Sequence, residues 1–136
     1  MKVKKPPQKP TNLRDYKCDL VIDNQHLTKL EISPYYEKHN KEYLEALKKK
    51  GIKLTPEELT ERLITDDLIR ELVKQLQKKH HFPEGRYYHW TYYSHRTFKE
   101  TELKIKAYKL VWCVADEEPH VLGLMDCYRR KKYDKT

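Results

Sequence analysis

The chain has 136 residues, enough for one domain with one core and too few for two. Hydrophobic residues make up 38% of it and charged residues 37%, and no apolar run has the length of a transmembrane helix or the position of a signal peptide, so we expect no membrane partner. Its three cysteines form no C-x-x-C pair, which argues against a zinc site and favours a reducing, cytoplasmic setting. We expect no metal and no cofactor.

The net charge of +8 is distributed unevenly along the chain. Residues 1–17 carry six basic and one acidic side chain, residues 18–77 carry ten and twelve, and residues 78–136 carry thirteen and eight. Both ends are therefore cationic and the middle is nearly neutral. A cationic C-terminal part favours a polyanion as partner, RNA or DNA, bound through phosphate contacts and counterion release. The alternative is an ordinary protein with many surface lysines.

The first quarter of the chain has weak signals. Residues 1–15 are rich in Lys and Pro and have little to bury, so we expect a flexible basic arm that contributes affinity rather than fold. Residues 16–22 form either a short edge strand or an extended lead-in. Asp23-Asn24 has the chemistry of a turn. Residues 26–32 alternate ambiguously and predict neither helix nor strand.

The middle of the chain has clear helix signals. Ser33-Pro34 is typical of a helix start, and Gly51 is typical of the end of that helix. Thr55 begins a capping box with Pro at the first helical position, the strongest local signal in the chain. Thr65 caps a further helix, in which apolar residues repeat on one face and predict packing against a core.

Beyond Pro83 the apolar period changes from 3.6 to 2 residues, which predicts strands. Residues 86–93 (RYYHWTYY) are aromatic and β-prone, and residues 103–115 include a run that is apolar on both faces. A last strand covers residues 121–130, after an acidic, Pro-containing turn. Residues 94–97 are polar and suggest a loop.

These elements predict one α+β domain over residues 16–136. Helices at about 34–79 are expected to pack on one face of an antiparallel sheet at about 86–130.

Two stretches resemble a known family of toxins. The segment YYSHRTF at residues 92–98 looks like the Tyr-Ser-x-His-Thr segment of MqsR-type toxins, with its His one residue early. YKLVWC at 108–113, LGLM at 122–125 and the closing Tyr-Arg-Arg at 128–130 look like the last two strands of phage- and toxin-associated members. Over about residues 33–130 the layout resembles RelE/MqsR-type toxins, within the superfamily that groups barnase, EndoU, certain colicins and RelE (BECR).

The resemblance implies metal-independent RNA cleavage on a RelE/BECR-like fold. A base takes the proton of the ribose 2′-OH, cations stabilise the phosphorane, and an acid protonates the leaving 5′-oxygen. The candidates for these catalytic roles are His39, His95, Arg96, Lys106, Tyr128, Arg129 and Arg130. The candidates for binding nucleic acid are Arg86, Tyr88, Lys131 and Lys132.

Each candidate also has a structural explanation. His39 lies beside an apolar stripe, where a histidine is more often a hydrogen-bonded packing residue. The structural explanation of Tyr128 is that it covers the edge of the sheet. For the basic residues after it, the structural explanation is a solvated tail. Strand alternation places Tyr128 and Arg130 on one face and Arg129 on the other, so one arginine should matter more than the other.

Three functions are therefore open. The first is a small endoribonuclease that acts as a toxin on RNA, with an antitoxin or immunity protein as a possible partner. The second is a non-enzymatic nucleic-acid-binding module, and the third is an antitoxin or immunity-type interaction protein. A nuclease should bring His95, Arg96 and Tyr128 together at one phosphate-sized cleft. A binding module would spread its cations along a groove without such convergence.

Overall fold

A computed structural model describes residues 12–136 of the chain. The expected basic arm falls mostly on residues 1–11, outside the described residues, whereas Arg14 and Asp15 already belong to the first strand. In chain order the elements are β1 (Arg14–Ile22), β2 (Gln25–Ile32), α1 (Tyr35–Lys49), α2 (Pro56–Arg62), α3 (Asp66–Leu72), the 3-10 turn η1 (Val73–Leu76), β3 (Gly85–Tyr87), β4 (Trp90–Glu100), β5 (Ile105–Ala115), β6 (Glu118–Arg129) and the 3-10 turn η2 (Lys131–Tyr133).

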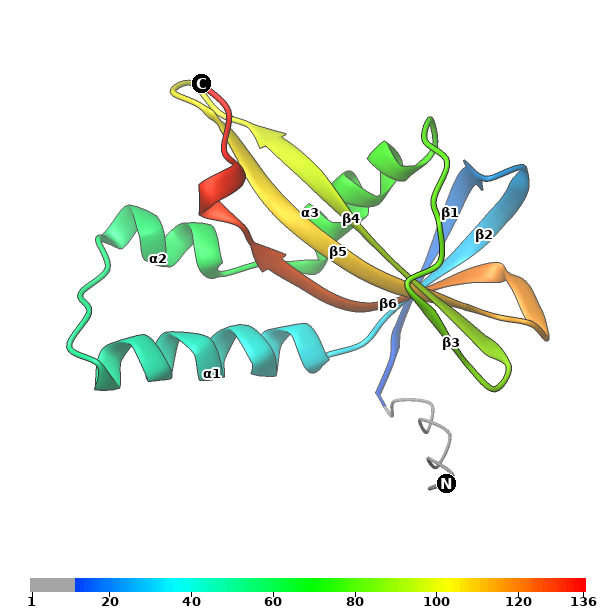
Figure 1. Cartoon of the computed structure of the whole chain (residues 1–136), viewed down its shortest axis with the longest axis horizontal. Coiled ribbons are helices and arrows are strands. Elements are labelled where there is room, and N and C mark those ends of the chain that lie inside the picture. Colours follow the sequence, from blue (N-terminus) through cyan, green and yellow to red (C-terminus); the bar gives the residue numbers. More distant parts are fainter. Residues whose placement is uncertain (1–11) are drawn as a thin grey trace.

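The fold is α+β, with a twisted six-stranded sheet and a helical segment inserted between its second and third strands (Figure 1). The strand order is β1-β2-β6-β5-β4-β3. β2 runs parallel to β6, from Lys29 beside Val121 to Ile32 beside Leu124, and the other neighbours are antiparallel. The expected order of helices first and an antiparallel sheet second is therefore wrong, because an N-terminal hairpin supplies two strands of a mixed sheet.

The position of β2 explains why its sequence was ambiguous. β2 lies between β1 and β6, and Leu30, Glu31 and Ile32 at its end are all buried, so apolar and polar residues do not alternate cleanly there. The turn chemistry of Asp23-Asn24 is confirmed. Both residues have positive φ, 49° and 66°, as a two-residue hairpin turn requires.

The expected strand at 86–93 is divided in two. Tyr88 has a φ of 51° and turns the chain, so that β3 pairs with the start of β4. Residues 94–97, expected as a loop, lie inside β4 and pair continuously with β5. Polar residues suit this part of β4 because one of its two faces is exposed. The turn before the last strand is also shorter than expected, because β6 begins at Glu118.

The helix signals at Thr55, Thr65 and Gly51 are confirmed. At Ser33-Pro34 the expected cap is absent, because α1 begins at Tyr35 with Pro34 as its N-cap and no side chain caps it. Thr55 and Glu58 make the reciprocal hydrogen bonds of a capping box, and Thr65 accepts a hydrogen bond from the backbone N–H of Leu68. Gly51 follows α1 with a φ of +75°, a left-handed conformation that side chains with a Cβ rarely adopt, and it ends that helix.

One face of the sheet carries the hydrophobic core. Ile69 and Leu72 of α3 and Leu76 of η1 are fully buried, in one core with Leu110 and Trp112 of β5. Burial of each such side chain contributes about 1.5–3 kcal/mol. In Figure 1, α3 lies behind β4 and β5, and α2 lies beside the end of β6.

β2 pairs with β6 only as far as Ile32, and beyond that residue the beginning of α1 lies next to β6. The Ser33 N–H donates to the Leu124 carbonyl at 3.0 Å, as a strand would. Further on, the Asn40 side-chain amide donates to the Cys127 carbonyl at 2.9 Å. These two bonds fix the first half of α1 against the edge of β6.

We call the second face of β4, β5 and β6 the open face. Side chains alternate between the faces of a strand, and Thr97, Leu110 and Cys127, which point to the core, are fully buried. Of their neighbours in the chain, all but the buried Asp126 are partly or fully exposed. The open face is formed by Ser94, Arg96, Lys109, Val111, Tyr128 and Arg130.

Asp66 joins three elements of the fold. Its carboxylate accepts hydrogen bonds from the hydroxyls of Tyr16 and Tyr36, at 2.7 and 2.5 Å, and from the guanidinium of Arg14 at 2.6 Å. Burial alone would raise the pKa of Asp66, but the bonds from Arg14, Tyr16 and Tyr36 lower it to about 2. The Asp66 carboxylate thus connects β1, α1 and the start of α3 through hydrogen bonds.

We predict that Asp66→Asn lowers the free energy of unfolding by about 2 kcal/mol at pH 7, a value that allows for the solvent exposure of Arg14. Since the folded pKa lies below the unfolded value near 3.9, this stability is present above pH 4 and is lost as the pH falls toward 2. Urea unfolding between pH 7 and 2 measures both effects. Asp67→Asn is the control, because that side chain is 94% exposed. Equal free energies of unfolding for both variants and the wild type at all pH values would contradict this role of Asp66.

Candidate functional site

Three cations stand next to one another on the open face. Arg96 of β4 lies directly opposite Lys109 of β5, and Lys109 lies opposite Tyr128 of β6. Arg130 follows β6 and keeps its alternation, because its N–H donates to the Ala107 carbonyl at 2.8 Å. Like charges placed opposite one another on a sheet destabilise it. We therefore treat this arrangement as a candidate anion site.

These cations line a cavity of about 400 Å³. None of its lining residues carries a carboxylate. They are Lys79, Ser94, His95, Arg96, Phe98, Lys109, Arg130 and Tyr133. We call Lys79, Arg96, Lys109 and Arg130 the cationic cluster. Among the described residues, no carboxylate lies within ion-pair distance of Arg96, Lys109 or Arg130. The cavity therefore has the size and the charge to hold a phosphate group.

The C-terminal turn η2 supports the cationic cluster. The guanidinium carbon of Arg96 lies 3.4 Å from the ring centroid of Tyr133, and that of Arg130 lies 5.1 Å from it. Lys132 is 5.0 Å away on the same ring. The neighbouring Arg130 and Lys132 lower the pKa of the Tyr133 hydroxyl. Stacking on one ring holds the two arginines in place before any ligand binds.

A histidine–carboxylate pair lies beside this cluster. His39 Nδ1 of α1 is 2.7 Å from Asp126 Oδ2 of β6, a close contact whose alignment is poor for a hydrogen bond. Burial raises the pKa of Asp126, while His39 and the backbone N–H of Cys127 act in the opposite direction. The His39 ring stacks on Tyr35, with centroids 5.7 Å apart. Its imidazole is 40% exposed and so remains accessible to a ligand.

Tyr128 connects the pair to the cluster. Its ring meets the His39 ring edge-on at 5.8 Å, and the guanidinium of Arg130 lies 6.0 Å from its centroid. His39, Tyr128 and Arg130 therefore form a continuous row on the open face. All three are candidates from the sequence, whereas the carboxylate of Asp126 is not.

His95 lies at the margin of the cavity. Its ring meets His81 at 4.8 Å, and its buried Nε2 has no hydrogen-bond partner among the described residues. Burial, followed by the charges of Lys79, His81 and Arg96, lowers the pKa of His95 to about 4. The imidazole is therefore neutral at pH 7. Strand alternation directs it toward the core side, away from Arg96.

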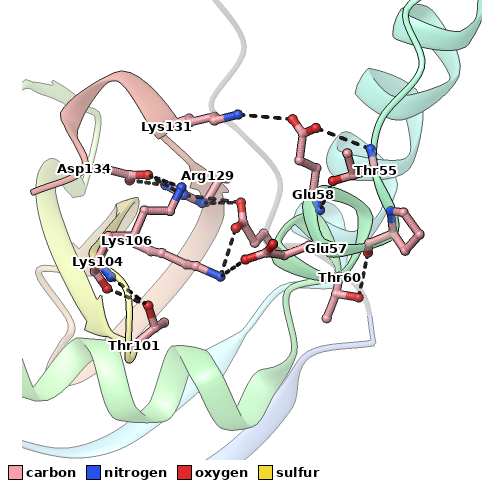
Figure 2. A network of polar contacts seen from close by, with 12 residues as sticks. Thr55, Glu57, Glu58, Thr60, Thr101, Lys104, Lys106, Arg129, Lys131 and Asp134 are labelled. Atoms are coloured by element: carbon pink, nitrogen blue, oxygen red, sulfur yellow. Dashed lines mark hydrogen bonds and ion pairs between the residues drawn. The ribbon is translucent and has the colours of Figure 1, made fainter. Parts of the chain in front are cut away.

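Two catalytic candidates lie in a separate network on the helix-covered face (Figure 2). The side chain of Arg129 has no exposed surface and binds Asp134 and Glu61, the latter at 3.3 Å. Lys106 Nζ is 2.9 Å from Glu61 Oε1 and also pairs with Glu57. Their charges are thus balanced by carboxylates from α2 and the C-terminal segment. We leave Lys106 and Arg129 out of the proposed site for this reason.

The four binding candidates do not form one surface. Arg86 pairs with Asp116, and Tyr88 lies in the turn between β3 and β4. Lys131 pairs with Glu58 at 3.2 Å (Figure 2). Lys132 alone among them adjoins the cationic cluster, through Tyr133.

Sequence reasoning missed four residues of this site, Lys79, Lys109, Asp126 and Tyr133. Lys109 lies inside a mainly apolar strand, and its exposure on one face is the signal that alternation offers. Within residues 12–136, no group of three or more His, Cys, Asp or Glu side chains is arranged to hold a metal ion, and no helix has the length and apolar character needed to cross a membrane.

Comparisons of the chain with models of protein families, with curated proteins and with solved structures found no match. The site must therefore be interpreted from its own geometry.

We predict that His95 makes the protein less stable in weak acid. An unfolded histidine takes up a proton near pH 6.5, whereas folded His95 does so only near pH 4. The unfolded state binds more protons between these values, so stability falls as the pH drops from 6.5 to 4. Thermal unfolding should show a weaker pH dependence in this range for His95→Asn than for the wild type. The exposed His120→Asn is the control, and an unchanged slope in His95→Asn would contradict the prediction.

Proposed function

We propose that the protein is a small endoribonuclease that cleaves single-stranded RNA on its open face by acid–base chemistry without a divalent metal. The observation that carries the proposal is the row from the His39–Asp126 pair through Tyr128 to the cationic cluster. It combines a group able to take a proton with an anion site that lacks any carboxylate.

The cationic cluster is the proposed site of the scissile phosphate. Cleavage passes through a phosphorane with more negative charge than the substrate, so fixed cations stabilise it more than they stabilise bound RNA. Arginine suits this role because its planar guanidinium donates two parallel hydrogen bonds to a phosphate. Arg96 and Arg130 are already oriented by Tyr133, so little ordering is required on binding.

His39 is the proposed base. Asp126 lies beside Nδ1, which leaves Nε2 to accept the proton of the ribose 2′-OH, and the nearby carboxylate stabilises the imidazolium that forms. The 2′-oxygen then bonds to phosphorus and the bond from phosphorus to the 5′-oxygen breaks. Tyr128 is the proposed donor of a proton to that oxygen. The products are a 2′,3′-cyclic phosphate and a 5′-hydroxyl, and exchange with water restores both side chains.

An activity of this kind would harm the cell that makes it, so we extend the proposal to a toxin that is inhibited by an antitoxin or immunity protein.

The two other functions predict different behaviour. A nucleic-acid-binding module would use the same cations without turnover, and an antitoxin or immunity protein would bind a protein partner in place of RNA.

We predict that the wild-type protein cleaves single-stranded RNA in the presence of EDTA and leaves 2′,3′-cyclic phosphate ends. His39→Ala and Arg130→Ala should each lower the cleavage rate by about 100-fold or more, because each removes a group that acts in the transition state. The assay uses end-labelled RNA separated on a gel. Circular dichroism of each variant checks that the fold is kept.

Arg70→Ala is the matched control, since Arg70 also stacks on a tyrosine, 4.5 Å from the ring of Tyr16, but lies outside the proposed site. It should retain full activity. Full activity of the His39 and Arg130 variants, or loss of wild-type cleavage in EDTA, would refute the mechanism. Wild-type binding without any cleavage would favour the binding module.

A further inference from the structure

A second cavity lies on the open face, beyond the cationic cluster. It has a volume of about 200 Å³ and is mainly apolar. We call it the apolar pocket. The residues that matter most for its chemistry are Trp90, Cys113, Gly123 and Met125 in its body, and Glu31 and Glu118 among its carboxylates.

The sheet register explains why there is a hollow here. Glu31 of β2 lies beside Gly123 of β6, which lies opposite Cys113 of β5, so these three residues form a row across the open face. A Cβ on Gly123 would lie 3.0 Å from Cys113 Sγ. The Cys113 thiol therefore already fills the space above Gly123, and only a glycine fits there. Because both residues are small, the floor of the pocket is shallow at this row.

The walls of the pocket are suited to a flat ring. Trp90 is the first residue of β4, where it pairs with Ala115 of β5, and it offers an indole for stacking. The Glu31 side chain is only 9% exposed and sits 3.4 Å from Lys29. Carboxylates accept hydrogen bonds, so this pocket favours a neutral ligand that presents an amino group. Adenine, cytosine and guanine each present an exocyclic amino group, whereas uracil presents none.

The spacing fits one strand of RNA. Along β5, Cys113 and Lys109 are four residues apart on the same face, or about 13 Å at the rise of a strand. A stretched chain of a few nucleotides covers such a distance. A phosphate in the cationic cluster would thus place a nearby base of the same strand over the apolar pocket.

We propose that the apolar pocket binds an amino-bearing nucleobase of the RNA, with Glu31 accepting a hydrogen bond from its amino group, and that it fixes where the strand is cut. The assignment rests on the proposed function for its place in cleavage. The binding itself does not depend on the cationic cluster.

Free nucleosides test the pocket separately, because they carry no phosphate. Adenosine, cytidine, guanosine, inosine and uridine are titrated to about 1 mM, which guanosine still reaches in solution and at which weak binding is detectable. NMR follows the backbone amide of Gly123 and the indole N–H of Trp90, with the buried Trp112 as internal reference. We expect amino-bearing nucleosides to shift both signals. Guanosine should bind more tightly than inosine, which lacks the amino group.

Glu31→Gln should bind amino-bearing nucleosides about tenfold more weakly, as expected for the loss of a hydrogen bond to a charged acceptor. Glu102→Gln, on an exposed turn, and Arg130→Ala, in the cationic cluster, should bind them normally. If the Glu31 variant does not fold, the wild type still tests recognition of the amino group. Tighter binding of guanosine than of inosine would support it, and equal binding would overturn it.

The possible failures are distinguishable. Nucleoside binding without RNA cleavage would sustain the pocket and refute the nuclease. RNA cleavage with no shift at Gly123 and Trp90 for any nucleoside would sustain the nuclease and overturn the pocket. Equal binding of uridine and the amino-bearing nucleosides would overturn the role of Glu31.

Discussion

The repulsion between Arg96 and Lys109, which face one another across β4 and β5, is the constraint on which the open face depends. Such a pair costs about 0.2–1 kcal/mol, and Arg130 adds a third charge close by. The opposite face compensates, because Trp112, Leu110 and the helical apolar residues are fully buried there. Sequences normally avoid such local conflicts except where a ligand resolves them. A bound phosphate would replace this repulsion with charge-assisted hydrogen bonds.

Strand alternation divides the cations of this region into two groups. Lys106 and Arg129 point to the helix-covered face and are neutralised by Glu61, with Asp134 completing the coordination of Arg129. Arg130, one residue further on, points to the open face and stacks on tyrosines. Removing a carboxylate from the buried network would leave an uncompensated charge, whose cost is several kcal/mol. Neighbouring arginines thus differ in environment according to the face they occupy: Arg129 is paired inside the structural network, and Arg130 belongs to the proposed binding site.

Local patterns were enough to predict the caps at Thr55 and Thr65, the turn at Asp23-Asn24 and the common face of Tyr128 and Arg130. Partnerships between distant residues were not predictable. Arg129 was expected at the site because no local pattern shows that it pairs with Glu61, which lies 68 residues away in the sequence. The parallel pairing of β2 with β6 joins segments that are even further apart. Asp126 was missed for the same reason, since only the docking of α1 on β6 brings His39 to it.

Phosphate binding by the cationic cluster is the basis of the proposed function, and arginine side-chain NMR tests it directly. A single-stranded 2′-O-methyl RNA lacks the attacking hydroxyl and binds without being cut. Titration with this RNA should shift the Nε–Hε signals of Arg96 and Arg130 and leave that of the buried Arg129 unchanged. Shifts at Arg129 or Arg86, with none at Arg96 and Arg130, would contradict the account.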